Sequence, residues 1–219
     1  MEKAVVFPKR YAILMFGCPL GHKRRENDIP KGEGPMKRKL AVFFPGRRYG
    51  VDCPLLYYAE SVCRGKGYDT LLMHYSEHRD VRDMISIDDN IRQTLPYVKE
   101  RIKEKDPGQY DEMLFVSKSI GTVAAGWLNQ ELGKDMPPIR HIFMTPLEQT
   151  FPYMDSPRNI VICGDRDQYL AEEELKNFCR EHGVQRFCFE GVGHSLEHDN
   201  MKDTLKTMGE IMEIVEKFA

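Results

Sequence analysis

The chain has 219 residues, of which 41% are hydrophobic and 30% are charged, and its formal net charge is −2. This composition excludes a disordered chain and predicts a globular protein that at this length fits a single domain spanning 1–219. No apolar run approaches the ~20 residues of a membrane-spanning helix, and the first ten residues lack the apolar stretch of a signal peptide. We therefore expect a cytoplasmic location and no contact with a membrane.

The N-terminal part of the chain differs from the rest in charge. Residues 1–48 contain 12 Lys and Arg against 4 Asp and Glu, whereas the remainder contains 20 against 30. Two strand-like runs, Ala4–Phe7 and Tyr11–Phe16, predict an antiparallel edge, and the segment 17–39 predicts a long basic surface loop. A basic segment can attract anions, but a solvated loop is the simpler interpretation. No nucleic-acid-binding motif accompanies it, so no nucleic-acid partner is expected.

From residue 40 onward, short apolar runs of strand length alternate with amphipathic helical patterns. The runs are nearly continuous in hydrophobic residues, which is typical of strands buried on both faces of a sheet. They are Leu40–Phe44, Leu71–Tyr75, Met113–Val116, His141–Met144, Ile160–Cys163 and Phe187–Phe189. In the intervening segments apolar residues recur every three or four positions, and the last helix has Asp199 as its candidate N-cap. This alternation predicts an α/β fold with a mostly parallel, doubly wound sheet.

The strongest functional signal is the segment Phe115–Gly121, which reads Phe-Val-Ser-Lys-Ser-Ile-Gly. A strand ends near Val116 and a helical pattern begins just after Ser119, so the Ser119 hydroxyl is expected to project from the turn between them. The small Gly121 permits close approach of helix and strand, and free N–H groups at the helix start can stabilise developing negative charge. This is the nucleophile-elbow pattern, although for the motif alone a helix N-cap serine is the alternative.

Two further signals follow later strands. Asp165 and Asp167 come just after the predicted strand that ends at Cys163, and His194 follows the last strand in a glycine-rich loop. A carboxylate can hold a histidine through its Nδ1–H, and the histidine can then take the proton of a serine. Serine, acid and histidine in this order each follow a parallel strand, where open α/β sheets bind ligands. Solvated loop charge and a surface histidine are the alternatives for each signal alone.

In these ordered landmarks, residues 39–219 resemble the α/β-hydrolase superfamily, especially its small dienelactone-hydrolase-like and esterase-like members. The resemblance implies Ser119 as the nucleophile and His194 as the general base. It implies Asp167 rather than Asp165 as the acid, because Gly-Asp-Arg-Asp at 164–167 matches the family's G-x-x-D pattern. It also implies an α/β-hydrolase fold with an antiparallel N-terminal edge and no large cap domain.

The resemblance further implies an oxyanion hole made by two backbone N–H groups. One belongs to Ile120, the residue after the nucleophile, and the other to Arg47, in the loop after the strand that ends at Phe44. The chain departs from the family at two places here. Ser117 replaces the first glycine of the elbow, and Phe44-Pro45-Gly46 stands where many members have His-Gly.

The segments around this site suggest how a substrate would be held. Thr145–Asn159 is too short for a helical cap, which predicts an open site. Leu147, Phe151 and Tyr153 are candidates to line an apolar acyl pocket, with coverage of the core edge as the alternative. Arg47 and Arg48, beside the oxyanion loop, are candidates to select a substrate carboxylate or phosphate, with solvated arginines as the alternative.

The predicted activity is a serine hydrolase that cleaves a small-molecule carboxylic ester or thioester through an acyl-enzyme on Ser119. Neither a cofactor nor a metal is expected, because the six cysteines lack ligand spacing and His194 and His198 do not form a metalloprotease motif. A non-catalytic ligand-binding protein on the same scaffold and an acyltransferase with the same triad are the alternatives. A phosphate- or nucleotide-binding protein is disfavoured by the absence of a Gly-rich phosphate loop.

Overall fold

The computed structural model describes residues 37–75, 85–134 and 136–219. Its centre is a six-stranded sheet in which every neighbouring pair of strands is parallel. From one edge to the other, the strands are β2 (Tyr68–Leu72), β1 (Lys39–Phe44), β3 (Glu112–Lys118), β4 (Ile139–Met144), β5 (Ile160–Gly164) and β6 (Gln185–Phe189).

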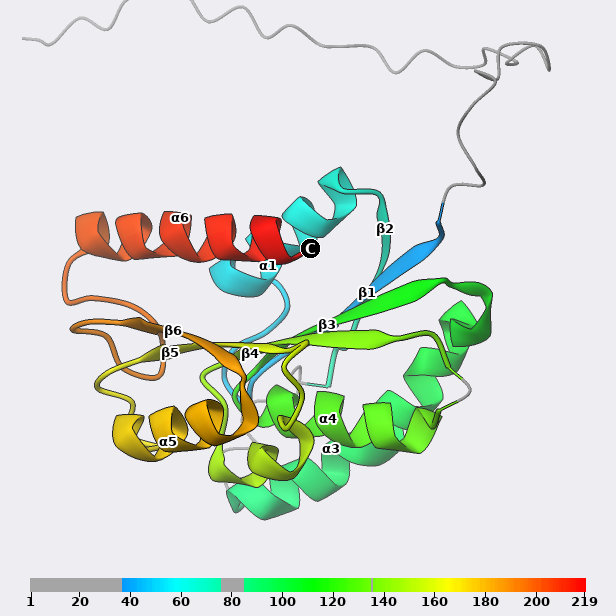
Figure 1. Ribbon diagram of the computed structural model, residues 1–219, viewed down its shortest axis with the longest axis horizontal. Helices are drawn as coiled ribbons and strands as arrows, with labels where there is room; N and C mark the ends of the chain where they lie inside the picture. Colours follow the sequence, from blue (N-terminus) through cyan, green and yellow to red (C-terminus); the bar gives the residue numbers. More distant parts are fainter. Residues whose placement is uncertain (1–36, 76–84, 135) are drawn as a thin grey trace, which may run out of the picture. The chain divides into compact units, whose positions relative to one another are not determined.

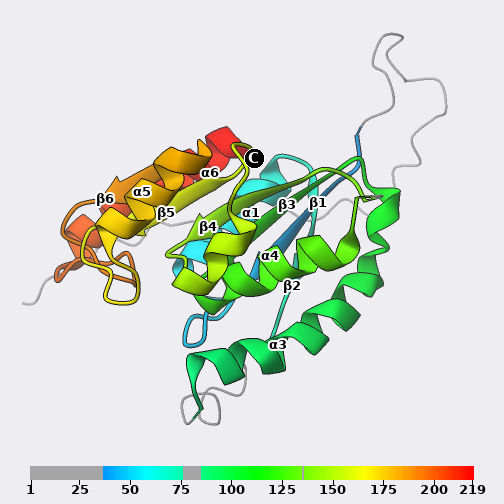
Figure 2. The ribbon, with the colours of Figure 1, turned by 60° about the horizontal axis from the view of Figure 1, so that its bottom comes forward.

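Helices cover both faces of this sheet (Figures 1 and 2). On one face lie α1 (Pro54–Gly65) and α6 (Met201–Phe218), and on the other lie α3 (Ile87–Arg101), α4 (Ile120–Leu132) and α5 (Glu172–His182). Short 3₁₀ turns occur at η1 (Ile102–Lys105), η2 (Pro107–Gln109) and η3 (Glu148–Tyr153). The predicted α/β architecture with a parallel, doubly wound sheet is confirmed.

The central strands consist mostly of hydrophobic residues because both of their faces are buried. In β1, Leu40, Val42 and Phe44 pack into the core beneath α3 and α4, whereas Ala41 and Phe43 pack into the core beneath α1 and α6. All five side chains are fully buried. Burial of each larger side chain contributes roughly 1.5–3 kcal/mol to folding, so the two helical layers are held firmly to the sheet.

The strand order reverses between β1 and β3, and this reversal locates the site. From β1 the chain passes to β2 at one edge, then returns to β3 on the other side of β1 and continues outward to β6. The loops that follow β1 and β3 therefore leave the sheet in opposite directions and open a crevice at the carboxyl ends of these strands. Pro45 and Ser119 are the first residues after these two strands.

Five of the six predicted strands agree with the observed ones to within two residues at each end, whereas the second strand and the N-cap of the last helix were placed wrongly. The second strand was expected at Leu71–Tyr75, but β2 begins at Tyr68 and ends at Leu72, because an edge strand can start with less apolar residues. Burial of Met73 and Tyr75, which follow the strand, explains the apolar pattern that suggested the later position. The N-cap of α6 is Asn200 rather than Asp199, since the Asn200 side chain accepts a hydrogen bond from a backbone N–H of the first turn.

Several expectations concern parts of the chain outside the described residues. The antiparallel edge at Ala4–Phe7 and Tyr11–Phe16 lies there, as does the proposed basic loop except for its last three residues. Residues 37–219 form one compact unit, and a single domain over 1–219 stays a prediction. Within the described ranges, no helix is long and apolar enough to cross a membrane, and the cysteines form no disulfide.

Candidate active site

Ser119 occupies a sharp turn between the end of β3 and the start of α4. Its backbone has φ 55° and ψ −125°, a left-handed conformation that costs a non-glycine residue about 1–3 kcal/mol. The turn is fixed by hydrogen bonds on both sides: the Ser119 N–H donates to the Met144 carbonyl at 3.1 Å, and the Ser119 carbonyl accepts from the Thr122 N–H at 2.9 Å. The strand-to-helix geometry thus holds the Ser119 side chain at the carboxyl edge of the sheet.

Small residues around the turn allow this geometry. A Cβ atom on Gly121 would lie 2.4 Å from the Phe44 carbonyl oxygen and 2.6 Å from that of Pro45, so only glycine fits against the end of β1. Ser117, which replaces the usual first glycine of the elbow, is fully buried and its hydroxyl donates to the Ile142 carbonyl at 3.2 Å. This departure from the family pattern is accommodated because the added hydroxyl finds a buried acceptor.

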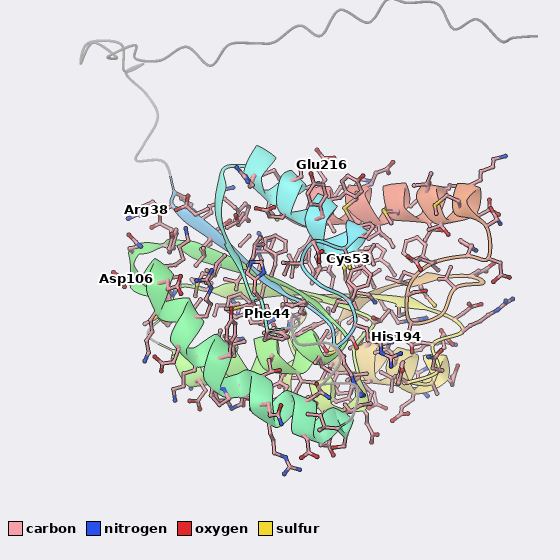
Figure 3. The ribbon with its side chains drawn as sticks, turned by 180° about the vertical axis from the view of Figure 1, so that it is seen from behind. Arg38, Phe44, Cys53, Asp106, His194 and Glu216 are labelled. Atoms are coloured by element: carbon pink, nitrogen blue, oxygen red, sulfur yellow. The ribbon has the colours of Figure 1, made fainter. Side chains whose placement is uncertain are left out.

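His194 lies in the loop between β6 and α6, and the fold brings it to Ser119. Its Nε2 is 2.8 Å from the Ser119 Oγ, and its Nδ1 is 2.8 Å and 3.0 Å from the two carboxylate oxygens of Asp167. With the ring proton on Nδ1, the imidazole donates to the carboxylate and accepts from the serine hydroxyl. Figure 3 shows His194 far from Arg38 and Asp106, which precede β1 and β3, and so toward the edge where the strands end.

The two carboxylates after β5 have separate partners. Asp165 Oδ1 accepts the Gly191 N–H at 2.7 Å, which ties the loop after β6 to the end of β5. Asp167 is turned toward His194 and also accepts the Tyr169 N–H at 2.9 Å. The residues alone did not decide which of these two aspartates would contact the histidine. The structure places Asp167 beside His194, as the family pattern implied.

Close backbone packing supports the His194 loop. A Cβ atom on Gly164 would lie 2.1 Å from the Val192 carbonyl oxygen, so this glycine lets the loop lie directly against the end of β5. The same Val192 carbonyl accepts the Arg166 N–H at 3.0 Å. The imidazole is therefore carried by a loop whose backbone is hydrogen-bonded to the residues that carry the acid.

The electrostatic environment of His194 favours the neutral form of its imidazole. Burial lowers the pKa of His194, the hydrogen bond to Asp167 opposes this effect, and the positive charge of Lys118 lowers the pKa further. The side chains of His194 and Asp167 are only 16% and 4% exposed. A neutral imidazole whose Nδ1–H is held by a carboxylate is the form that can accept a proton from a serine hydroxyl.

Lys118 belongs to this site, although the sequence interpretation gave it no role. Its side chain is 1% exposed, and its Nζ donates to the Thr145 Oγ1 at 2.8 Å and to the His194 carbonyl at 2.6 Å. Burial lowers the pKa of Lys118 from 10.5 to about 8. The signal in the sequence was a lysine that directly follows five apolar or small residues, 113–117, in a strand buried on both faces.

A pocket of about 470 Å³ opens beside Ser119 and His194. Of the residues predicted for the oxyanion hole and the substrate, Ile120, Arg47, Arg48 and Leu147 line it. Ile120 is the first residue of α4, where backbone N–H groups have no partner within the helix. Residues that the sequence analysis did not assign to the pocket also line it, namely Gly46, Tyr49, Ile87, Lys118, Gln168, Tyr169, Gly193 and Ser195.

Two predicted pocket residues lie elsewhere. The Phe151 ring stacks on Phe178 of α5, with ring centroids 4.4 Å apart. Tyr153 packs over Gly126 of α4, where a Cβ atom would lie 2.2 Å from the tyrosine Cβ. Both residues close the core under η3, so neither lines the pocket beside Ser119. In the part of the chain that the structure describes, no cluster of three or more metal-ligating side chains occurs.

Comparisons with known proteins rest on the structure, because no family model and no curated protein sequence matches the chain. An α/β serine hydrolase homologue from Coxiella burnetii superposes with a TM-score of 0.57 at 16% identity, covering 86% of this chain and 87% of that one. A lidless α/β serine hydrolase from Xanthomonas campestris gives 0.58 at 14% identity, covering 87% of both chains.

Est1E from Butyrivibrio proteoclasticus, in its structure with ferulic acid bound, gives a TM-score of 0.56 at 12% identity and covers 87% of this chain and 91% of that one. In this chain the connection between β4 and β5 is short and contains η3 but no α-helix. The described part of the chain has the α/β-hydrolase fold.

Proposed function

We propose that this protein is a serine hydrolase that cleaves a small carboxylic ester or thioester through an acyl-enzyme on Ser119. The observation that carries the proposal is the hydrogen-bonded chain from Ser119 Oγ through His194 to Asp167, with contacts of 2.8 Å on both sides of the imidazole. These hydrogen-bonded residues lie at the turn between β3 and α4, and Ser119 and His194 line an accessible pocket. The names of the similar structures, serine hydrolases among them, support the same reaction class.

In the proposed reaction, Ser119 Oγ attacks the substrate carbonyl carbon while its proton moves to His194 Nε2. The carbonyl electron pair moves onto oxygen, and the N–H groups of Ile120 and Arg47 are proposed to hold this oxyanion. When the carbonyl re-forms, the bond to the leaving alcohol or thiol breaks and His194 supplies the proton that the leaving group needs. Water then attacks the acyl-enzyme by the same steps, and Ser119 regains its proton.

The short contact between Ser119 and His194 favours catalysis over the non-catalytic alternative, which would leave the serine covered or the histidine turned away. Acyl transfer to an acceptor other than water uses the same residues, so only competition between acceptors distinguishes it from hydrolysis. An acyltransferase would give more acyl product as a nucleophilic alcohol or amine is added, whereas a hydrolase would continue to release the free acid.

Labelling with a fluorophosphonate probe tests the proposal. We expect the wild-type protein to be labelled, and Ser119→Ala and His194→Ala to lose labelling because the nucleophile or its base is missing. Ser156→Ala and His182→Ala are matched controls, since Ser156 lies before the amino end of β5 and His182 stacks on Phe178. A folded wild-type protein that is not labelled would refute the proposal.

The two aspartates after β5 provide a second test. Asp167→Asn should lower kcat by about 10⁴-fold, because an amide no longer fixes the imidazole tautomer or stabilises the imidazolium. Asp165→Asn keeps an oxygen that can accept the Gly191 N–H and should leave kcat within a few-fold of wild type. Equal kcat losses in the two variants, measured on a chromogenic ester, would contradict the assigned role of Asp167.

A further inference from the structure

Among the described residues, Lys118 is the only Lys, Arg, Asp or Glu that is buried as a whole residue, backbone and side chain together. It directly precedes Ser119, at the last position of β3. An ammonium group removed from water is unfavourable unless its surroundings compensate it, and a buried methionine of similar shape avoids this cost. The presence of the charge at this position therefore calls for an explanation beyond packing.

The contacts of Lys118 join three segments that meet at the site. Its Nζ donates to the hydroxyl of Thr145, the first residue after β4, and to the backbone carbonyl of His194 in the loop before α6. The Nζ also lies 5.1 Å from the centroid of the Tyr49 ring, in the loop after β1. Each partner is neutral, and in the described ranges no carboxylate is paired with this lysine. Lys118 thus links the elbow to the loop that supplies the imidazole.

The backbone of Thr145 is itself constrained, so the hydrogen bond between Lys118 and Thr145 has a defined geometry. Thr145 has a left-handed backbone with φ 44°, and its N–H donates to the Ile162 carbonyl at 2.8 Å. The Thr145 hydroxyl is therefore presented from a fixed turn. With one end anchored on that turn, the Lys118 ammonium holds the His194 carbonyl at 2.6 Å.

We propose that Lys118 is a positioning residue for the hydrolysis proposed above: it holds the His194 loop through the backbone carbonyl and places a buried positive charge near the imidazole. This inference rests on the proposed function. Lys118 acts through His194 rather than on the scissile bond, because its donors are directed at Thr145 and at the backbone of His194.

The charge of Lys118 acts among several other ionisable groups. The imidazole of His194 faces Asp167 from the loop after β5, and the Tyr169 ring packs edge-on with its centroid 4.5 Å away. Around Lys118 itself lie Tyr49 and, at longer range, Asp167, Glu197 and Cys53. Asp167 raises the pKa of His194 and Lys118 lowers it, so loss of the lysine charge should leave a base that becomes protonated at higher pH.

The test compares Lys118→Met, which removes charge and donor, with Lys118→Gln, which keeps a donor without the charge. The measurements are kcat and KM for p-nitrophenyl acetate and the rate of fluorophosphonate inactivation across the acidic and neutral range. We expect kcat to fall by roughly 10- to 100-fold in Lys118→Met, because a misplaced base is costly, and by less in Lys118→Gln. In both variants the acid limb of the pH–rate profile, where protonation of His194 stops the reaction, should move to higher pH.

Two control variants separate positioning from stability. Thr145→Val removes one acceptor but keeps the charge and the bond to His194, so kcat should fall only a few-fold while the acid limb stays in place. Lys99→Met changes a lysine that pairs with Glu131 on the helical surface and should behave as wild type. If Lys118→Met does not fold, the comparison is made between Lys118→Gln and Thr145→Val. The proposal then requires the acid limb of the pH–rate profile to move to higher pH in Lys118→Gln and to stay in place in Thr145→Val.

The possible failures are distinguishable. A wild-type protein that neither hydrolyses the ester nor reacts with the probe refutes the proposed function itself. An active wild type, with kcat and acid limb unchanged in Lys118→Met and Lys118→Gln, refutes the role of Lys118 alone. A lowered melting temperature or a raised KM, with an unmoved acid limb, also overturns the inference, because that pattern is what a purely structural lysine would give.

Discussion

Because Gly121 has no Cβ atom, α4 can start directly against the end of β1. We expect Gly121→Ala to destabilise the protein by at least about 1–3 kcal/mol, because its Cβ would meet two backbone carbonyl oxygens that cannot move aside cheaply. Gly209→Ala is the matched control, since a Cβ at Gly209, inside α6, has nothing within 4 Å and should stabilise the helix by about 0.5–1 kcal/mol. Urea unfolding of both variants measures the difference. Equal stabilities would contradict the assigned close approach.

His141, in β4, is expected to make the stability of the protein depend on pH. Its ring is fully buried, stacks on Phe143 and contacts the Asn129 side chain through Nε2 at 3.1 Å. Burial lowers its pKa from 6.5 to about 3. Between these values the unfolded chain binds a proton that the folded protein does not, so acidification favours unfolding by up to about 1.4 kcal/mol per pH unit from this one group.

We therefore expect the free energy of unfolding to fall as the pH drops from 6.5 toward 3, and to fall less steeply in His141→Phe. Above pH 6.5 the difference between wild type and variant should be constant, because neither state then binds the extra proton. Urea unfolding at a series of pH values provides the measurement. Parallel curves for the two proteins throughout the acidic range would show that His141 is not the group responsible.

At the scale of elements, the start of α6 is fixed by one side chain. The Asn200 Oδ1 accepts the Asp203 N–H at 3.0 Å, whereas Asp199 is exposed and precedes the cap. Asn200→Ala should cost about 1 kcal/mol of stability, and Asp199→Ala should stay within about 0.5 kcal/mol of wild type. Thermal unfolding of the two variants measures these losses of stability. A larger loss in Asp199→Ala than in Asn200→Ala would show that Asp199, as predicted from the sequence, is the N-cap.

The elements that could be predicted are those whose pattern is set by local burial. The strands β1, β3, β4 and β5 are mostly buried, and their apolar runs are visible without the structure. The edge strand β6 is only partly buried, but its apolar residues Phe187–Phe189 still mark it in the sequence. The edge strand β2 was placed three residues late because Asp69 and Thr70, near its start, are polar and not buried, which interrupts the apolar run. Phe151 was assigned to the pocket because the sequence does not reveal Phe178, on a helix far along the chain, as its stacking partner.

At the scale of the whole molecule, the order of Ser119, Asp167 and His194 was readable because each follows a strand, and parallel strands end at one edge. What the sequence could not supply was the path of the loops between the strands. The burial of Lys118 and the pocket contact of Tyr169 depend on how those loops cross the edge of the sheet. Their roles therefore became visible only with the three-dimensional arrangement.

The charge of the pocket differs from that of the molecule, and this difference predicts a substrate preference. The chain has a net charge of −2, yet the described pocket wall contains Arg47, Arg48 and Lys118 and no Asp or Glu. A concave site with one sign of charge attracts ligands of the opposite sign, and added salt screens this attraction. For a serine hydrolase built on this wall, we expect kcat/KM for an ester bearing a free carboxylate to fall with ionic strength more steeply than kcat/KM for its neutral analogue.

Arg48→Gln should reduce this preference, with a rise in KM for the anionic ester of about tenfold and little change for the neutral one, because an arginine–carboxylate contact acts mainly on binding. Arg92→Gln is the matched control, since Arg92 is an exposed arginine of α3 that lies 3.8 Å from Asp89 and away from the pocket wall. Steady-state kinetics at low and high salt measure both effects. If the two esters respond equally to salt and to Arg48→Gln, the cationic wall does not select the substrate, and the apolar side chains of Ile87 and Leu147 would then be the ones to vary.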